Sequence, residues 1–141
     1  MDIGSERKLA DAFDRISSKF GPRVAIMEQK SGGIETVLGA KFDPNFGQTI
    51  MFGSGGIAVE KIKDLSFRLA PVSSMQAEQM ILETKIGSLI ADKFDLASLT
   101  EAIVNFSHLV TQNEEILEMD INPLKVFKES VLAQDVRAKI K

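Results

Sequence analysis

The sequence predicts an α+β fold in which helices pack on one face of a mostly antiparallel sheet. Three segments have apolar residues spaced by three and four, as amphipathic helices do. Short runs rich in Val, Ile and Thr are separated by turn-forming residues, and two alternating segments near the C-terminus are joined by a polar turn. With 141 residues, 44% of them hydrophobic, the chain can bury one core, and we expect a single domain over residues 1–141.

Composition excludes several classes of function. The net charge of −3 and the interspersed signs leave no basic stripe, so we expect no nucleic-acid partner. The absence of cysteine excludes disulfides, thiolate catalysis and zinc-thiolate sites. No apolar run approaches the roughly 20 residues of a membrane span, and the charged N-terminus has no signal-peptide core. We therefore expect a cytoplasmic protein with no membrane partner.

The first predicted element is an amphipathic helix from Ser5 to Lys19. Leu9, Phe13 and Ile16 follow one another at helical spacing, with Ser5 placed to cap the first turn. Gly21-Pro22 is expected to end it.

A run of strands follows, rich in β-branched residues and divided by turns that contain glycine, proline and asparagine. Such short turns favour antiparallel neighbours. The predicted strands are Val24–Gln29, Glu35–Phe42, Gln48–Phe52, Ile57–Ile62 and the extended segment Leu65–Val72.

After residue 72 the apolar period changes to that of a helix. Ser73 or Ser74 is placed to cap a helix that is expected to stop before Gly87. Its Met75 and Met80 are both expected in the core. A third helix is predicted from Leu96 to Val110. Its His108 has no Asp or Ser constellation around it and is interpreted as an ordinary helix residue.

The last predicted element is a hairpin formed by residues 119–124 and 132–135. If Asn122 lies opposite Asp135, the apolar residues of both strands share one face, whereas a shift of one residue would mix that face. An amide and a carboxylate placed side by side supply the oxygen ligands that Mg²⁺ prefers, with nucleotide phosphates completing the shell. On spacing alone the alternative stands open that Asn-Pro opens a turn and that Asp135 bonds only to nearby backbone.

Other residues are candidates for contact with a ligand. Gly53, Gly55 and Gly56 form a glycine-rich turn whose amides could approach a phosphate, or which only forms a turn between strands. Arg68 lies on a mainly apolar strand and needs an anion, either a neighbouring carboxylate or a ligand phosphate, and the carboxylate is favoured.

Five motifs together resemble the ATP-grasp domain of NDP-forming acyl-CoA synthetases, that is, the ADP-forming acetate–CoA ligases related to the β subunit of succinyl-CoA synthetase. They occur in one order over nearly the whole chain, and their sequences are EQKSGGIE (28–35), GAKFDPNFG (39–47), MFGSGGI (51–57), DLSFRLAP (64–71) and DINPL (120–124).

The resemblance implies the interconversion of acyl-CoA, ADP (or GDP) and phosphate with free acid, CoA and the nucleoside triphosphate, through a phosphohistidine carried elsewhere. It also implies roles for single residues. Glu28 would lie at the hinge that holds the base, Glu35 would face the ribose, and Asn122 and Asp135 would ligate Mg²⁺. The glycine motif, with Gly53, Gly55 and Gly56, would lie near the phosphates, and Arg68 would lie near the path of the phosphoryl group in a catalytic role.

The chain also departs from the family pattern. The lysines that the family places on the triphosphate, the CoA-binding domain and the phosphohistidine domain are not in this sequence, which resembles the C-terminal half of the ATP-grasp fold. The resemblance thus implies partners: a lysine subdomain, a CoA-binding domain or subunit, the nucleotide and a CoA thioester. The alternative is a non-catalytic interaction or regulatory remnant of a synthetase-like or protein-acetyltransferase domain. The presence of Asn122 and Asp135, the two residues expected to ligate magnesium, favours the enzyme. The missing lysines favour the remnant.

Overall fold

The computed structural model describes residues 3–26, 30–55 and 64–141, and the chain divides into two compact units, Met1–Gly32 and Gly33–Lys141. The first unit contains helix α1, Glu6–Phe20. The hydroxyl of Ser5 accepts from the Lys8 amide, and Gly21 ends the helix with a positive φ of 96° while its amide donates to Ser17. The predicted helix and both of its ends are confirmed.

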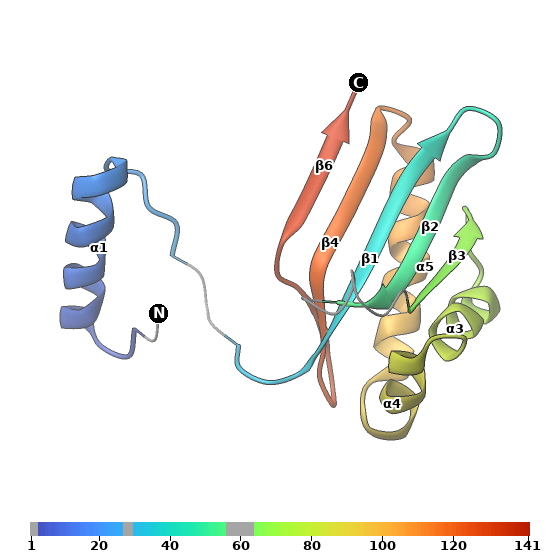
Figure 1. Ribbon diagram of the computed structural model, residues 1–141, viewed down its shortest axis with the longest axis horizontal. Coiled ribbons are helices and arrows are strands. Elements are labelled where there is room, and N and C mark those ends of the chain that lie inside the picture. Colours follow the sequence, from blue (N-terminus) through green and yellow to red (C-terminus); the bar gives the residue numbers. More distant parts are fainter. Residues whose placement is uncertain (1–2, 27–29, 56–63) are drawn as a thin grey trace. The chain divides into compact units, whose positions relative to one another are not determined.

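The second unit contains one antiparallel sheet, with strand order β3-β2-β1-β4-β5 and with β6 also paired to β4 (Figure 1). Each pairing is antiparallel, as the short turns between the predicted strands indicated. The strands are β1 Ile34–Asp43, β2 Gly47–Ser54, β3 Leu65–Leu69, β4 Ile116–Val126, β5 Val131–Ala133 and β6 Val136–Ile140.

The helices described in this unit all pack on one face of the sheet (Figure 1). They are α3 Ser74–Leu82, α4 Lys85–Lys93 and α5 Leu96–Gln112. Their apolar faces meet one face of the strands in a core that includes the fully buried Leu38, Phe52, Met80, Leu99 and Ile103. The predicted fold class, an α+β layer with helices on one sheet face, is therefore confirmed.

Helix α4 was not predicted, because Gly87 looked like a helix stop. The residue lies inside α4, where a Cβ would meet the carbonyl oxygen of Ile81 at 1.7 Å. Glycine is therefore needed for close packing against the end of α3, and the true break comes earlier, at Glu83 and Thr84. A second correction concerns Met75, which was expected in the core with Met80 and is 72% exposed.

The strands differ from the predicted ones in three places. Residues 24–26 form no strand, and residues 27–29 and the predicted strand 57–62 lie outside the described residues. Strand β3 ends at Leu69, just before Pro71. A further strand, β6, follows Asp135, so this aspartate lies between two strands and not at the end of the last one.

Candidate functional site

The sheet has one face without a described helix of its own unit, and several candidate residues, among them Glu35, Asn122 and Asp135, lie on this open face. Directly opposed residues of antiparallel strands share a face. Leu38 and Ile121 are opposed and buried under the helices, so Gly39 and Asp120, which are the next opposed pair, lie on the open face. The same register places Arg137 opposite Asp120, also on this face.

Asn122 and Asp135 lie opposite each other, as the hydrophobic pattern predicted. The amide of Asn122 donates to the carbonyl of Asp135 at 2.9 Å, and both residues are exposed. Asn122 follows the buried Ile121, and Asp135 precedes Val136, which is opposed to Ile121. Strand alternation therefore directs the side chains of Asn122 and Asp135 toward the open face.

Around this pair, β4 and the segment that runs from β5 to β6 each contain one residue more than a regular strand alternation needs. On β4 two residues, Asn122 and Pro123, separate the buried Ile121 and Leu124, and the pairing with β1 shifts by one residue there. The partner strands match this with Gln134 and Asp135 between Ala133 and Val136. The hydrogen bond from the Gln134 amide to the carbonyl of Pro123, 3.1 Å, keeps the two strands joined across the interruption.

Asp135 has one described side-chain partner, Arg137. Guanidinium Nη2 lies 3.4 Å from carboxylate Oδ2, and the arginine and aspartate side chains are 76% and 52% exposed. An exposed pair at this distance contributes little to stability, about 0 to 1 kcal/mol. Asp135 is thus held weakly and is accessible to an incoming cation.

Glu35 lies one row along the same face. It is opposed to Lys125, and Lys125 Nζ lies 3.5 Å from Glu35 Oε1. The lysine side chain is only 13% exposed and the glutamate 47%. The carboxylate is therefore oriented by a well-packed cation while it keeps an accessible edge.

Gly53 lies near Asn122, because it is opposed to Val37 and Val37 faces the interruption at Asn122. Two strand spacings, about 10 Å, separate β2 from β4. A Cβ at Gly53 would meet the carbonyl oxygen of Asp64 at 2.1 Å, and one at Gly55 would meet that of Thr36 at 2.6 Å. The Gly55 amide already donates to the Glu35 carbonyl at 2.9 Å. These contacts give both glycines a packing role, and their contact with phosphate stays a prediction.

Asp64 fastens this corner of the sheet to helix α4. Its carboxylate accepts from the Ser54 hydroxyl at 2.9 Å and from the amides of Lys85 and Ile86 at 2.8 and 3.1 Å. Burial raises the pKa of the Asp64 carboxyl, but the hydrogen bonds from Lys85, Ile86 and Ser54 together outweigh it, and the pKa is lowered. Asp64 is therefore a structural carboxylate at a helix N-terminus.

Arg68 is not brought together with Asn122 and Asp135. It is opposed to the buried Ile50, so it lies on the helix face, and it bonds Glu83 Oε1 at 2.5 Å. The bond from Arg68 lowers the pKa of the Glu83 carboxyl. The carboxylate partner favoured by the sequence is confirmed, and a catalytic contact of Arg68 stays a prediction. Glu28 and Gly56, the remaining site candidates, lie outside the described residues.

The residues present fit a magnesium ion that keeps most of its shell for other ligands. Asn122 and Asp135 supply an amide oxygen and a carboxylate, and no group of three or more Asp, Glu, His or Cys that could hold a metal occurs in the described part of the chain. Mg²⁺ is commonly held by one or two side chains plus waters and substrate phosphates. Two oxygen donors on an exposed face match that mode better than a closed protein cage.

Beside this pair the open face has a shallow hollow of about 330 Å³. Gly39 has no side chain to fill the hollow, and a Cβ at this position would come within 3.2 Å of Met51 Cε. Charged residues stand at its rim. Its lining includes Gly39, Lys41, Met51, Phe67, Glu118 and Asp120.

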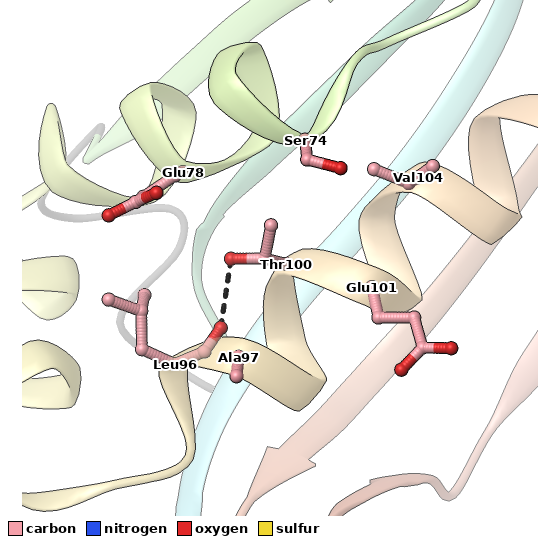
Figure 2. A pocket seen from close by; sticks show the side chains of 7 residues that line it. All are labelled: Ser74, Glu78, Leu96, Ala97, Thr100, Glu101 and Val104. Atoms are coloured by element: carbon pink, nitrogen blue, oxygen red, sulfur yellow. Dashed lines mark hydrogen bonds between the residues drawn. The ribbon is translucent and has the colours of Figure 1, made fainter.

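A second hollow, of about 490 Å³, lies between α3 and α5 (Figure 2). Two carboxylates, Glu78 and Glu101, stand at its edges, and the Thr100 hydroxyl already donates to the Leu96 carbonyl at 2.9 Å. Its described lining includes two carboxylates and no cation that would attract a phosphate, so the open face is the better candidate.

Sequence reasoning missed Lys125, Arg137 and Asp64. The alternation of charges in Val136–Ile140 was a usable signal for β6 and hence for Arg137. Lys125 follows from the register once Glu35 is placed.

None of the described helices is both long and apolar enough to cross a membrane.

Comparisons with known proteins identify the family of the chain. A model of the ATP-grasp domain matches residues 1–140. The chain is 39% identical to acetate–CoA ligase (ADP-forming) I of Archaeoglobus fulgidus, covering 97% of this chain and 22% of that protein. It is also 39% identical to the β subunit of acetate–CoA ligase (ADP-forming) I of Pyrococcus furiosus, covering 74% of this chain and 47% of the subunit. The chain thus spans less than half of these curated relatives.

A solved structure shares the fold. Acetyl-coenzyme A synthetase 1 of Ca. Korarchaeum cryptofilum, in complex with coenzyme A and Mg-AMPPCP, matches with a TM-score of 0.92 and 32% identity, covering 100% of this chain and 67% of that one. The match of fold, motifs and sequence confirms the resemblance drawn from the five motifs. The chain belongs to the ATP-grasp family, in the form found in ADP-forming acyl-CoA ligases.

Proposed function

We propose that this chain forms the magnesium-binding wall of a nucleotide cleft in an ADP-forming acid–CoA ligase. The enzyme would couple formation or cleavage of an acyl-CoA thioester to phosphoryl transfer between ADP and ATP. Asn122 and Asp135 would hold Mg²⁺, and Glu35, oriented by Lys125, would accept from ribose hydroxyls. The bound ion would neutralise charge on the phosphates.

One observation supports this proposal above the others: an exposed amide and carboxylate are opposed on the sheet face that no described helix of the Gly33–Lys141 unit covers. A remnant that serves only as an interaction module has no physical need for such a pair. The Korarchaeum synthetase, which was solved in complex with Mg-AMPPCP, supports the same ligand classes for this chain.

The second half of the cleft would come from a lysine subdomain, and the acyl group from a CoA-binding domain or subunit, on another segment or chain. Without the phosphate-binding lysines the 141-residue chain should bind Mg·ATP weakly. Calorimetry is expected to give a dissociation constant above about 1 μM, so the binding free energy should be weaker than about 8 kcal/mol. A sub-micromolar value would contradict the half-cleft assignment.

The test of the metal pair uses the chain itself, with Mn²⁺ as a paramagnetic substitute for Mg²⁺. In two-dimensional NMR spectra of the labelled chain, substoichiometric Mn²⁺ should first broaden the amide signals around Asn122 and Asp135. This readout detects weak binding and also locates it. The broadening should be lost in Asp135→Asn.

The matched control is Glu129→Gln, which removes one charge from the exposed turn of the same hairpin. It should leave the broadening unchanged. Broadening that is centred elsewhere, or that persists in Asp135→Asn, would overturn the magnesium assignment and favour the non-catalytic alternative.

A further inference from the structure

Arg137 is the charged residue that contacts the proposed metal pair, and the roles argued above leave it unused. It lies on the open face, opposite Asp120 and two residues after Asp135. Its guanidinium Nη2 is 3.4 Å from Asp135 Oδ2. A cation at this distance from a metal ligand would repel an incoming metal ion, so its position calls for a role in the cleft.

We propose that Arg137 is a phosphate-binding residue of the cleft, which rests on Asp135 until a metal–nucleotide complex arrives. This inference rests on the proposed function and adds a specific contact to it. In the resting state the guanidinium partly neutralises Asp135 and occupies one of its oxygens. When the metal takes over Asp135, Arg137 is released and its fork of N–H donors turns to the phosphate oxygens.

Three features of the structure support this exchange. The Asp135–Arg137 pair is long and largely exposed, with 76% of the arginine side chain accessible, so its release costs little. The side chain stands on an edge strand at the open face, with no described helix of its unit above it. Asp120, which is opposed to Arg137, is a second carboxylate on this face, and it would keep the guanidinium near the site once a divalent cation has taken over Asp135.

Lys139 shows why Arg137, and not any cation of β6, is singled out. It belongs to the same exposed strand and is opposed to Glu118, one row farther from the metal pair. A strand rise of about 6.8 Å per two residues separates it from Arg137, which places it beyond hydrogen-bond reach of the metal pair. Lys139→Gln therefore removes the same charge from the same strand without touching the proposed exchange.

The experiment compares two titrations of the full chain followed by NMR, one with Mn²⁺ alone and one with Mg·ATP. Arg137→Gln should raise the affinity for free Mn²⁺ by about three- to tenfold, because a competing positive charge is removed. The same variant should lower the affinity for Mg·ATP by about three- to tenfold, because a charge-assisted phosphate contact is lost. Opposite signs in the two titrations are the diagnostic result.

Two further variants separate charge from geometry and position. Arg137→Lys should bind free Mn²⁺ like the wild type and Mg·ATP with an intermediate affinity, since it keeps the charge and loses the fork. Lys139→Gln should change both affinities by less than about twofold. All variants affect exposed residues, and their amide spectra report directly whether they fold.

The outcomes distinguish this inference from the proposed function. If Asp135→Asn abolishes Mn²⁺ broadening and Arg137→Gln changes neither titration, the metal site stands and the role of Arg137 is wrong. If Arg137→Gln and Lys139→Gln have equal effects, the guanidinium acts only through the general field of the strand, and the inference is again overturned. If Asp135→Asn leaves Mn²⁺ binding intact, the magnesium assignment itself fails.

Discussion

Two aspartates of the Gly33–Lys141 unit have the same side chain in very different surroundings. Asp64 accepts three hydrogen bonds, from Ser54, Lys85 and Ile86, and joins strand β2 to helix α4. Asp135 has one long contact with an exposed arginine and stands on the open face. A carboxylate whose oxygens already accept hydrogen bonds within the protein stabilises the fold, whereas one whose oxygens are accessible is available to a ligand.

The two arginines repeat this contrast. Arg68 is bonded to Glu83 and shares the helix face with Ile50, while Arg137 rests on Asp135 at the opposite face. Sequence reasoning singled out Arg68 because an arginine on an apolar strand needs an anion. The structure supplies that anion within the protein, so the more informative arginine is the one on the open face.

The largest expected effect that would sharpen this contrast is on activity. In an enzyme reconstituted with the proposed lysine subdomain and CoA-binding partner, Asp135→Asn should lower turnover by about a hundredfold or more, because one carboxylate would supply most of the charge of the proposed metal site. Its melting temperature should remain within about 1–2 °C of the wild type, since Asp135 holds little of the fold. A variant that melts much earlier and turns over normally would make Asp135 a second structural aspartate.

The reverse result is expected for Asp64→Asn. Loss of the charge weakens the bonds to the first turn of α4, and we expect the free energy of unfolding to fall by about 2 kcal/mol. Chemical denaturation of the 141-residue chain measures this change. Mn²⁺ broadening around Asn122 should persist in the folded variant, and its loss would mean that the two regions are not independent.

Acid should reveal the same difference without a mutation. The pKa of Asp64 is lowered on folding, so its contribution is complete above its unfolded value, about pH 4, and is lost as pH falls through the folded pKa. Stability measured between about pH 6 and pH 2 should therefore decline more steeply in the wild type than in Asp64→Asn. Parallel curves for the two proteins would show that the hydrogen bonds of Asp64 contribute little.

The smallest expected effect is at Arg68. Arg68→Met and Glu83→Gln should each lower the melting temperature by no more than about 4 °C, as expected for a partly exposed ion pair. Neither should alter Mn²⁺ binding by the chain. In the reconstituted enzyme, a large loss of turnover in Arg68→Met but not in Glu83→Gln would instead support the catalytic role that the motif implied.

Much of the described structure is predictable from sequence where one periodicity dominates. The pairing of Asn122 with Asp135 followed from the apolar faces of two strands. The cap of α1 followed from Ser5, and of the two serines predicted to cap α3 the structure uses Ser73. Helix α4 escaped prediction because Gly87 is required by a tertiary contact with Ile81, which no local signal reveals. Arg137 and Lys125 escaped because their roles depend on which residues lie across the sheet.

Because β4 and the β5–β6 segment each contain an extra residue near Asn122, the length of one segment constrains the length of the other. Deleting Pro123 alone would make the register with β1 regular but leave the partner strand one residue too long, so that β6 slips against β4 and its charged residues turn toward the core face. Deleting Pro123 and Gln134 together would leave an uninterrupted ladder with Ile121 still opposed to Val136 and Leu124 to Ala133. Insertions and deletions in this hairpin are therefore expected to be accepted in pairs, one in each strand, so that the chain length of one arm constrains that of the other.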